Sequence, residues 1–573
     1  MFAYCILITP SNTVSSWRIL IRRVLEKASQ YKGLCLESST PALDSASAWN
    51  HLKDTTSVCP ECLAAIPASV GVRRGKVYLS KTCTKHGSFE DIYWSSRDLY
   101  ERASRYAMQG AEPAVRQTDS RNMCPRDCGL CPNHKNHTIL AVMDITNLCN
   151  AKCPTCFASS NKQKEYVYEP SIEQIRFMLD SIASDVHAMQ LTGGEPTLRP
   201  DLHEIIYEAK LRDINHIEIN TNGIVFASSR GTQLTKSLES MFGDESPKKG
   251  LSTVYLKFNG FSPATWEATT GEPDWGKIPL RAVENIKKGY SNTRRSPGIM
   301  LVPTLINGLN THEIGDIIGY AMKESYAIRG VNFQPVSFAG SMSARDLETK
   351  RYTLSDLFMD VEEQTKGDIN AEDFFPISCV SPFAETVWYW KGRGMPSFAC
   401  HPHCGAMTAL FIHDGDFVTI SRYVDMDKFF VFLQRAATCF KQGKRTRGKI
   451  NVVRALTGIK RKGIGSLLPL VKDVAGDVDN WRSLGRLLLH MVFIGGMHFM
   501  DRYNFDLERV QMCPIHQILP DGSRVPFCTY QTIHRPLLER KFSVSVEERT
   551  KIMSAQQRIM PSLAPEMQIP PEV

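Results

Sequence analysis

The sequence has no hydrophobic run long enough to cross a membrane. Its longest apolar run, residues 487–494, contains a histidine, whereas a transmembrane helix needs about 20 apolar residues. The apolar N-terminus, residues 1–8, has no preceding basic residue and no clear small-residue cleavage site after it, so we expect no secretory signal. These absences predict a cytoplasmic protein, with at most a peripheral contact on the inner face of the cell membrane.

A general excess of one charge sign is also missing. Lys+Arg number 68 and Asp+Glu 60, giving +8. Residues 441–462 hold nine basic residues and no acidic one, so the rest of the chain is close to neutral. We therefore expect no nucleic-acid partner. The basic segment, followed by apolar residues 464–471, suits either an anionic membrane surface or a solvated loop.

What the sequence does have is cysteine. Seventeen cysteines in 573 residues come in close sets, a pattern that indicates metal binding in a reducing compartment rather than a disulfide scaffold. Hydrophobic residues are 42% and charged residues 22%, the usual composition of globular proteins. A chain of this length allows roughly three or four domains.

Strand and helix patterns alternate through the middle of the chain. The spacing predicts strands at 139–145, 187–191, 214–220, 253–258, 299–305 and 330–334, with helices at 171–184, 201–211, 278–289 and 311–324. Repeated βα units with apolar strands imply a parallel sheet covered by helices. Six units suit an α/β fold of the partial (β/α)6 barrel type, whose chemistry lies at the carboxyl ends of the strands.

Three cysteines follow the first predicted strand directly. Cys149, Cys153 and Cys156 can bind three irons of a 4Fe–4S cluster and leave the fourth iron open to a non-protein ligand, unlike closed four-cysteine ligation. A structural zinc loop is the alternative. Further motifs follow the second and third strands, so all three motifs converge on one rim. They comprise Gly193, Gly194, Glu195 and Asn222.

With these motifs the chain resembles the radical S-adenosylmethionine (SAM) enzymes. The resemblance implies that Cys149, Cys153 and Cys156 carry the catalytic cluster and that SAM completes it. It also implies that the Gly-Gly-Glu motif holds the methionine amino end, with Asn222 near the cofactor. Many members have an aromatic residue before the third cysteine, whereas Thr155 stands there in this sequence.

Two outer groups contain enough cysteines to bind further clusters. One group precedes the first strand and the other lies in the last third of the chain, and the eight cysteines suffice for two auxiliary 4Fe–4S clusters. Buried free thiols are the alternative for the scattered ones. The two groups are Cys124, Cys128 and Cys131, and Cys379, Cys400, Cys404, Cys513 and Cys528.

A mononuclear metal site is predicted nearer the N-terminus. Cys59, Cys62, Cys83 and His86 suit tetrahedral zinc, and iron is nearly as good. These sites divide the chain into a partial barrel with flanking metal-binding regions. We expect an N-terminal extension at 1–50, a cysteine-rich mononuclear module at 51–105, an auxiliary-cluster segment at 106–138, the radical SAM partial barrel at 139–340, and an iron–sulfur-binding and substrate region at 341–573.

Residues 55–530 resemble a narrower group, the archaeal tetraether lipid synthases, of which one member was earlier considered a pterin methyltransferase. The matching stretches are 59–62, 81–87, 128–131, 153–158, 332–335, 403–406, 497–501 and 526–528. Asn259 departs from the aspartate expected there. The resemblance implies a lipid biosynthesis transferase that joins unactivated alkyl chain ends of archaeal diether lipids through a 5′-deoxyadenosyl radical.

Two other functions stay open at this stage. One is radical methylation of a pterin precursor, and the other is a non-enzymatic iron–sulfur electron carrier. A long apolar tunnel would favour the lipid substrate, and a compact polar cavity would favour a small-molecule substrate. Either enzyme needs a reducing partner such as ferredoxin or flavodoxin.

Overall fold

The computed structural model describes residues 48–119, 124–160, 165–242, 250–289, 297–391, 399–413, 416–456, 458 and 491–549. Residues 1–47 of the predicted N-terminal extension, which include Cys5 and Cys35, and the end of the basic segment at 459–462 lie outside the described residues. Within the described part, no helix is both long and apolar enough to span a bilayer.

The first described region is a four-stranded antiparallel sheet with the strands in sequence order. It comprises β1 Asn50–Val58, β2 Ala65–Arg73, β3 Lys76–Cys83 and β4 Gly87–Trp94. Helix α3, Arg97–Ser104, follows and begins at the Ser96 cap. The helix ends at Ser104, and Tyr106 beyond it bonds Asp427 and packs on Phe375.

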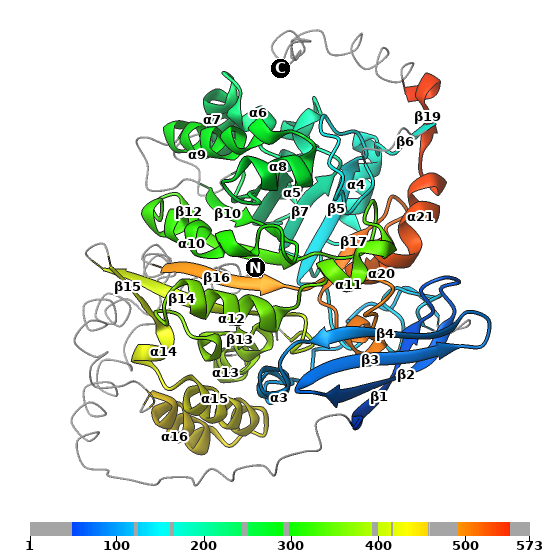
Figure 1. The fold of residues 1–573 in the computed structure, drawn as a ribbon. Coiled ribbons are helices and arrows are strands. Elements are labelled where there is room, and N and C mark those ends of the chain that lie inside the picture. The colour runs from blue at the N-terminus through cyan, green and yellow to red at the C-terminus, as the bar shows by residue number, and fades with distance from the viewer. Residues whose placement is uncertain are drawn as a thin grey trace.

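The larger sheet contains the six predicted parallel strands, in the order β12-β10-β9-β8-β7-β5. Helices cover its outer face (Figure 1), so the predicted α/β partial barrel is confirmed. The strands are β5 Leu140–Thr146, β7 Ala188–Gly193, β8 His216–Thr221, β9 Thr253–Lys257, β10 Gly298–Val302 and β12 Ile328–Pro335. The predicted helices are α4 Ile172–Asp180, α5 Leu202–Leu211, α9 Lys277–Gly289 and α10 Ile314–Lys323.

Alternation of side chains along these strands explains the packing. Ile217 and Ile219 of β8 have no exposed surface and pack in one core with Ile205 of α5 and Val283 of α9. Successive strand residues point to opposite faces, so Glu218 lies on the inner face. The apolar residues therefore fix which face the helices cover.

Both edges of the six-stranded sheet are extended by the C-terminal region. β16, Met491–Met497, pairs parallel with β12, and β17, Ile515–Ile518, pairs parallel with β5. β14, Gly405–His413, then pairs antiparallel with β16. The sequence did not predict these additions. Shorter strands complete the sheet, namely β11 Thr304–Leu305, β13 Phe375–Pro376, β15 Asp416–Thr419 and β18 Arg524–Pro526.

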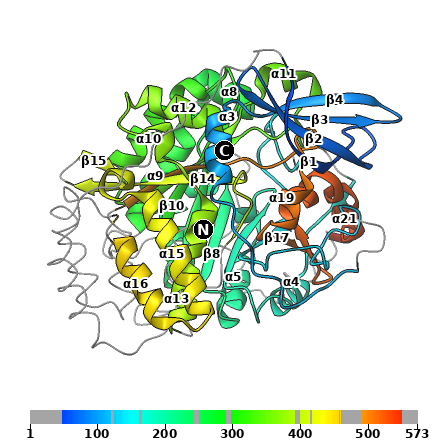
Figure 2. The same cartoon turned by 90° about the horizontal axis from the view of Figure 1, so that it is seen from below.

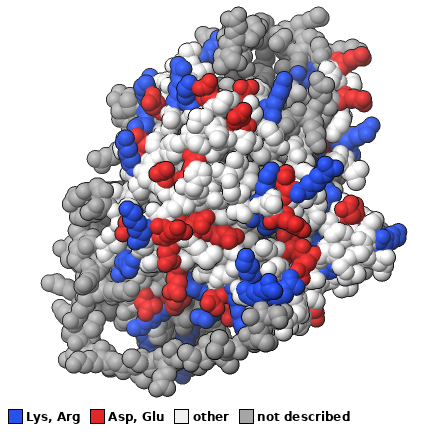
Figure 3. Space-filling model, in the orientation of Figure 1, with Lys and Arg blue, Asp and Glu red and all other residues white. Residues whose placement is uncertain are grey.

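A helical layer lies at the β13–β14 side of the molecule, away from the four-stranded sheet (Figures 1 and 2). It consists of α13 Ser381–Lys391, α15 Met426–Lys441 and α16 Arg445–Leu456. The described part of the basic segment lies at the end of α15 and in α16. Acidic and basic side chains are interspersed on the face drawn in Figure 3. That face therefore carries no uniform charge among the described residues.

The remaining elements connect or flank these layers. They are β6 Tyr166–Val167, α6 Ile224–Ala227, α7 Gly231–Ser240, α8 Pro263–Thr270, α11 Leu347–Lys350, α12 Leu354–Gln364, α14 Ile420–Tyr423, α19 Leu507–Gln511, α20 Phe527–Thr529, α21 Arg535–Lys541, β19 Val544–Ser545, 3-10 turns at Pro196–Leu198, Pro273–Gly276, Thr311–Glu313, Ala344–Asp346, Ala371–Asp373 and Ile377–Val380, and a π-helical turn at Tyr530–His534.

Candidate iron–sulfur and cofactor sites

The three-cysteine loop leaves the carboxyl end of β5 and lies on the rim of the barrel. Cys149, Cys153 and Cys156 pack together against Trp266 and Trp275. The indole Nε1 of Trp275 is buried and has no hydrogen-bond partner among the described residues. This orphaned donor beside three thiols fits a bound group that can accept a hydrogen bond.

Charges around the loop act in opposite directions. Burial, and then the Glu195 carboxylate, raise the pKa of Cys149 to about 12. Lys257 Nζ lies 3.2 Å from Cys153 Sγ and supplies a positive charge to the same loop. Thiolates are the form that binds iron, so a bound cluster must supply much of the charge that keeps Cys149 deprotonated.

Glu195 lies beneath the loop and connects two strand ends. Its Oε1 accepts from the Thr197 hydroxyl at 2.6 Å and the Thr221 hydroxyl at 2.7 Å, and its Oε2 accepts from the Asn222 amide at 2.7 Å. Burial raises the pKa of Glu195, and these hydrogen bonds lower it. The carboxylate thus fixes the turn after β8, and its binding of an ammonium group stays a prediction.

The paired glycines allow two backbone segments to touch. An added Cβ on Gly193 would lie 2.0 Å from Thr146 O, and one on Gly194 would lie 2.0 Å from Leu148 O. Gly193 also has a φ of +128°. The Gly194 amide donates to Thr146 O at 2.7 Å. Any side chain here would push the turn after β7 away from the start of the cysteine loop.

Asn222 touches the cysteine loop directly. Its Nδ2 donates to Asn150 Oδ1 at 2.8 Å and lies 3.9 Å from Cys149 Sγ. Its own Oδ1 accepts from the Ile224 amide at 3.0 Å. The structure therefore brings the predicted cofactor residues of three strand ends to one place.

Sequence reasoning missed a buried network that holds this loop from the C-terminal side. Arg535 of α21 donates to Asp144 Oδ2 at 2.6 Å and to Glu539 Oε2 at 3.3 Å. Glu539 in turn accepts from Asn147 Nδ2 at 2.9 Å. All four side chains are buried. Only a contact across nearly 400 residues creates this network, and local patterns carry no signal of it.

The predicted mononuclear site is assembled in the four-stranded sheet. The ligand atoms of Cys59, Cys62, Cys83 and His86 all lie within 4.8 Å of one another. Backbone donation from Lys85, together with His86, lowers the pKa of Cys83 to about 6. Three thiols and an imidazole at this spacing match a tetrahedral metal site.

The outer cysteines gather in two neighbouring sets. Cys400 lies among Cys379, Cys404 and Cys513, whose negative charges add to burial in raising its pKa. In the other set the Cys124 and Cys128 thiols are hydrogen-bonded, and Cys131 lies beside them.

Cys528 lies near both sets. Cys128 and Cys528 pack against the same apolar cluster of Met500, Phe505 and Val510. Arg509, almost fully buried, lies beside both Cys404 and Cys528. The charges of Cys404 and Cys513 also act on or with Cys528, so Cys528 lies between the two groups, next to a buried cation.

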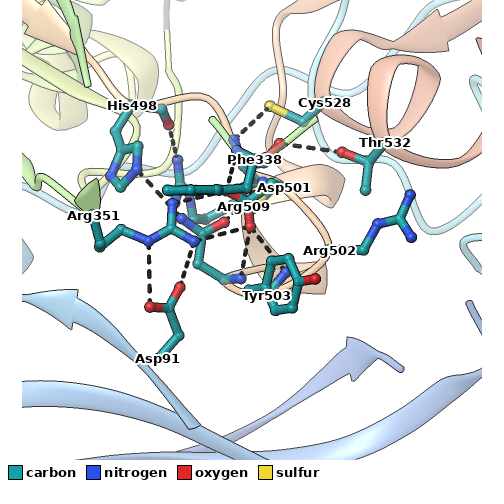
Figure 4. Close-up of polar contacts among 12 residues, drawn as sticks. Asp91, Phe338, Arg351, His498, Asp501, Arg502, Tyr503, Arg509, Cys528 and Thr532 are labelled. Atoms are coloured by element: carbon teal, nitrogen blue, oxygen red, sulfur yellow. Dashed lines mark hydrogen bonds and ion pairs between the residues drawn. The ribbon is translucent and has the colours of Figure 1, made fainter. Parts of the chain in front are cut away.

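A buried charge network anchors the segment that contacts Cys528 (Figure 4). Arg351 donates to Asp501 Oδ2 at 2.8 Å and to Asp91 Oδ2 of β4 at 2.6 Å. Asp501 also accepts from the Phe338 amide at 2.8 Å. The amide N–H of the neighbouring Met500 donates a hydrogen bond of 3.4 Å to Cys528 Sγ. The network thus connects the four-stranded sheet, the barrel and the second cysteine set.

Comparison with known proteins places these sites in context. Residues 143–321 match the radical SAM superfamily, and residues 51–95 match the HMPTM N-terminal zinc ribbon domain. A 7,8-dihydro-6-hydroxymethylpterin dimethyltransferase of Methanocaldococcus jannaschii is 39% identical over 87% of this chain and 96% of its own length. A GTP 3′,8-cyclase of Clostridium acetobutylicum is 25% identical over 44% of this chain and 69% of its own.

Among solved structures, the FeFe-hydrogenase maturase HydG of Carboxydothermus hydrogenoformans aligns with a TM-score of 0.31 at 16% identity. The alignment covers 40% of this chain and 52% of that one.

The predicted lipid-coupling function is contradicted by the full-length relative, which is a pterin dimethyltransferase. The assignment to the tetraether lipid synthase group is likewise unsupported, and with it a role in archaeal membrane lipid synthesis. The substrate prediction failed for a chemical reason, because the matched motifs indicate only cluster binding and radical formation. Such motifs serve many substrates, so they could not identify the molecule that the radical attacks.

Proposed function

Because the chain belongs to the radical SAM family that includes the M. jannaschii pterin dimethyltransferase, we propose that it transfers methyl groups to a reduced pterin. The observation that carries this proposal is the 39% identity, which extends over 96% of that relative. A shared superfamily domain alone would not indicate a substrate, whereas a match along nearly the whole relative includes the regions that flank the barrel.

Cys149, Cys153 and Cys156 would hold the 4Fe–4S cluster that binds SAM. When bound, this cluster supplies the electron that cleaves SAM into methionine and a 5′-deoxyadenosyl radical. The protein's own contribution is positional. Glu195 fixes Asn222 against the cysteine loop.

Trp266 and Trp275 shield the loop from water. Both are buried, with exposed fractions of 0% and 6%. Excluding water protects a reactive radical from side reactions.

The two outer cysteine sets would hold auxiliary 4Fe–4S clusters. One set is Cys379, Cys400, Cys404 and Cys513, and the other is Cys124, Cys128, Cys131 and Cys528. Burial raises the pKa of Cys379, Cys400 and Cys513 well above the usual range. Such thiols become thiolates only beside a strong positive charge, and iron provides one. Ferredoxin or flavodoxin would deliver the electrons.

Anaerobic incubation tests the function. The protein is mixed with a chemical reductant, SAM carrying an isotopic methyl label, and 7,8-dihydro-6-hydroxymethylpterin. We expect 5′-deoxyadenosine and a pterin whose mass increases by one or two methyl groups, labelled if SAM is the donor. The triple variant Cys149→Ala, Cys153→Ala, Cys156→Ala should lose about four irons and form neither product. Intact pterin after active SAM cleavage would contradict the proposal.

A further inference from the structure

Helices α15 and α16 form a hairpin that lies directly on part of the outer cysteines. Phe430 of α15 packs in the same apolar cluster as Cys379 and Cys400. α16 packs on α15 in turn, since a Cβ added to Gly448 would lie 2.6 Å from the ring of Phe440. Only α15 therefore separates Cys379 and Cys400 from the far side of that helix, and an α-helix with its side chains is about 10–12 Å across.

The far side of α15 is exposed. Phe430 and Leu433 of this helix are buried, on the side of the cysteines. Val431 and Arg435 are exposed, and residues four apart share one side of a helix. An open groove of about 550 Å³ between α15 and α16 is lined by these two residues and by Asn451, among others. Within the described part of the chain, this side of α15 is an accessible surface.

The hairpin is strongly positive from Arg435 onward. Residues 435–456 include seven basic residues and no acidic one. The acidic residues that precede them are engaged locally, since Asp425 accepts from the Lys428 amide at 3.0 Å and Asp427 accepts from the Tyr106 hydroxyl. Six of the seven basic side chains are exposed and form no ion pair with any described residue, namely Arg435, Lys441, Lys444, Arg445, Arg447 and Lys449.

Packed side chains lead inward from the hairpin. Met497 of β16 packs on the apolar cluster that contains Cys379 and Cys400. It also packs on a second apolar cluster, inside the barrel, which Cys513 and Phe527 contact. The cysteines beneath α15 are thus connected through one methionine to the region beside β5 and β17.

Two stacked rings continue this line to the radical loop. Phe527 and Phe157 stack with ring centroids 6.1 Å apart and an interplanar angle of 21°. Phe157 directly follows Cys156 of the radical loop, and Phe527 directly precedes Cys528. An electron received beside α15 therefore has a path through packed protein to the loop.

A surface of this charge suits a negatively charged electron carrier. Four thiolates give the 4Fe–4S cluster of a ferredoxin a net negative charge, and opposite charges steer two proteins together. The helical layer also exposes Trp388, Val431 and Ile450, with exposed fractions of 45%, 44% and 47%. Apolar and cationic side chains together are typical of protein interfaces. An anionic membrane would match the charge, but it would make no use of the cysteines beneath the surface.

We propose that the α15–α16 surface docks an acidic, ferredoxin-type electron carrier, which reduces the protein through the neighbouring Cys379 and Cys400. One electron leaves the carrier and enters the iron held by this cysteine group, and no bond forms or breaks. The assignment rests on the proposed auxiliary clusters and does not depend on the pterin substrate.

Charge reversal in the full, cluster-loaded protein tests the proposal. The first variant combines Arg445→Glu with Arg447→Glu in the first turn of α16, where acidic residues are compatible with the helix dipole. The second is Arg435→Glu on α15. The matched control combines Arg281→Glu with Lys288→Glu, which are exposed on α9, at the other end of the molecule (Figure 1). Both double variants change the net charge equally.

A reduced two-cluster ferredoxin then drives SAM cleavage. Formation of 5′-deoxyadenosine gives KM for ferredoxin, and calorimetry gives its Kd. We expect both surface variants to raise KM and Kd about tenfold or more at low salt, and added salt should narrow the difference. Iron content and SAM cleavage driven by dithionite should match the wild type, because a small reductant needs no docking surface. The α9 control should match the wild type throughout.

Wild-type KM and Kd for ferredoxin in the iron-loaded α16 variant overturn the proposal. If that variant does not retain its iron, Arg435→Glu decides. Loss of binding to phosphatidylglycerol vesicles with unchanged ferredoxin kinetics also overturns it, in favour of a membrane contact. Ferredoxin-driven SAM cleavage that is weakened by these variants supports the docking surface even if no pterin is methylated, and the proposed methyltransferase function alone then fails.

Discussion

Asn147 donates a hydrogen bond of 2.9 Å to Glu539, although 392 residues separate them. Asn147 stands two residues before the first cysteine of the radical loop, and Glu539 lies in α21. Arg535 of the same helix pairs with Asp144 at the end of β5. One C-terminal helix therefore holds both the strand end and the loop that leaves it.

Removing the Arg535 charge should destabilise the protein strongly. Arg535→Met leaves Asp144 and Glu539 buried without their cation, and burial already raises the pKa of Asp144 despite Arg535 beside it. Breaking a buried pair costs about 3–5 kcal/mol. Denaturant unfolding under anaerobic conditions measures the loss. Arg540→Met, on the exposed side of α21, should change stability little, and equal effects of the two variants would contradict the buried-network role.

A methyl group at Gly194 should separate the two rim segments. Its Cβ would lie 2.0 Å from Leu148 O, whereas a Cβ on Gly319 of α10 meets nothing within 4 Å. Overpacking typically costs about 1–3 kcal/mol. We expect Gly194→Ala to lower stability and weaken SAM binding, measured by calorimetry. Gly319→Ala should be neutral or stabilising, because alanine is the better helix former by about 1 kcal/mol.

Loss of one thiol from the mononuclear site should release its metal. Cys59 is fully buried at the end of β1, and its Sγ lies 3.4 Å from His86 Nδ1. Cys59→Ala should remove one metal ion per chain and expose the four-stranded sheet to protease. Metal analysis and limited proteolysis check this. Cys439→Ala, outside every cysteine set, is the control, and unchanged zinc and iron in Cys59→Ala would refute the site.

His137 should make stability depend on pH. Burial lowers its folded-state pKa below the usual value near 6.5. The unfolded chain then binds the proton more readily, so the stabilising contribution is complete above pH 6.5. It declines as the pH falls from there toward the folded-state pKa. Unfolding at pH 7.5 and pH 5.5 should show a smaller decline for His137→Gln than for the wild type, and parallel declines would argue against it.

The sequence predicted the six parallel strands because each has an apolar pattern of its own. Residues 487–494 were recognised as apolar, yet the pairing of β16 with β12 depends on a partner far along the chain. The close cysteine groups were found by spacing, whereas the position of Cys528 between the two outer groups required the fold.

The role of the glycines shows the same limit. The adjacent glycines Gly193 and Gly194 predicted a close approach of another segment to their backbone. The structure shows that this segment is the backbone of Thr146 and Leu148. The prediction of the substrate was wrong, because the substrate depends on the inward-facing side chains of the barrel. Residues such as Tyr255 and Asn332 lie on different strands and form no continuous sequence motif.

The position of β16 and β17 has a consequence for synthesis of the chain. Until residues 491–518 leave the ribosome, β5 and β12 are unpaired edges of a parallel sheet, which are prone to pairing with other chains. Cys513 lies within this stretch and Cys528 follows it, so the C-terminal group of cysteines is incomplete on a shorter nascent chain. Completion of the outer cysteine groups and closure of the sheet edges are therefore late events in the synthesis of this chain.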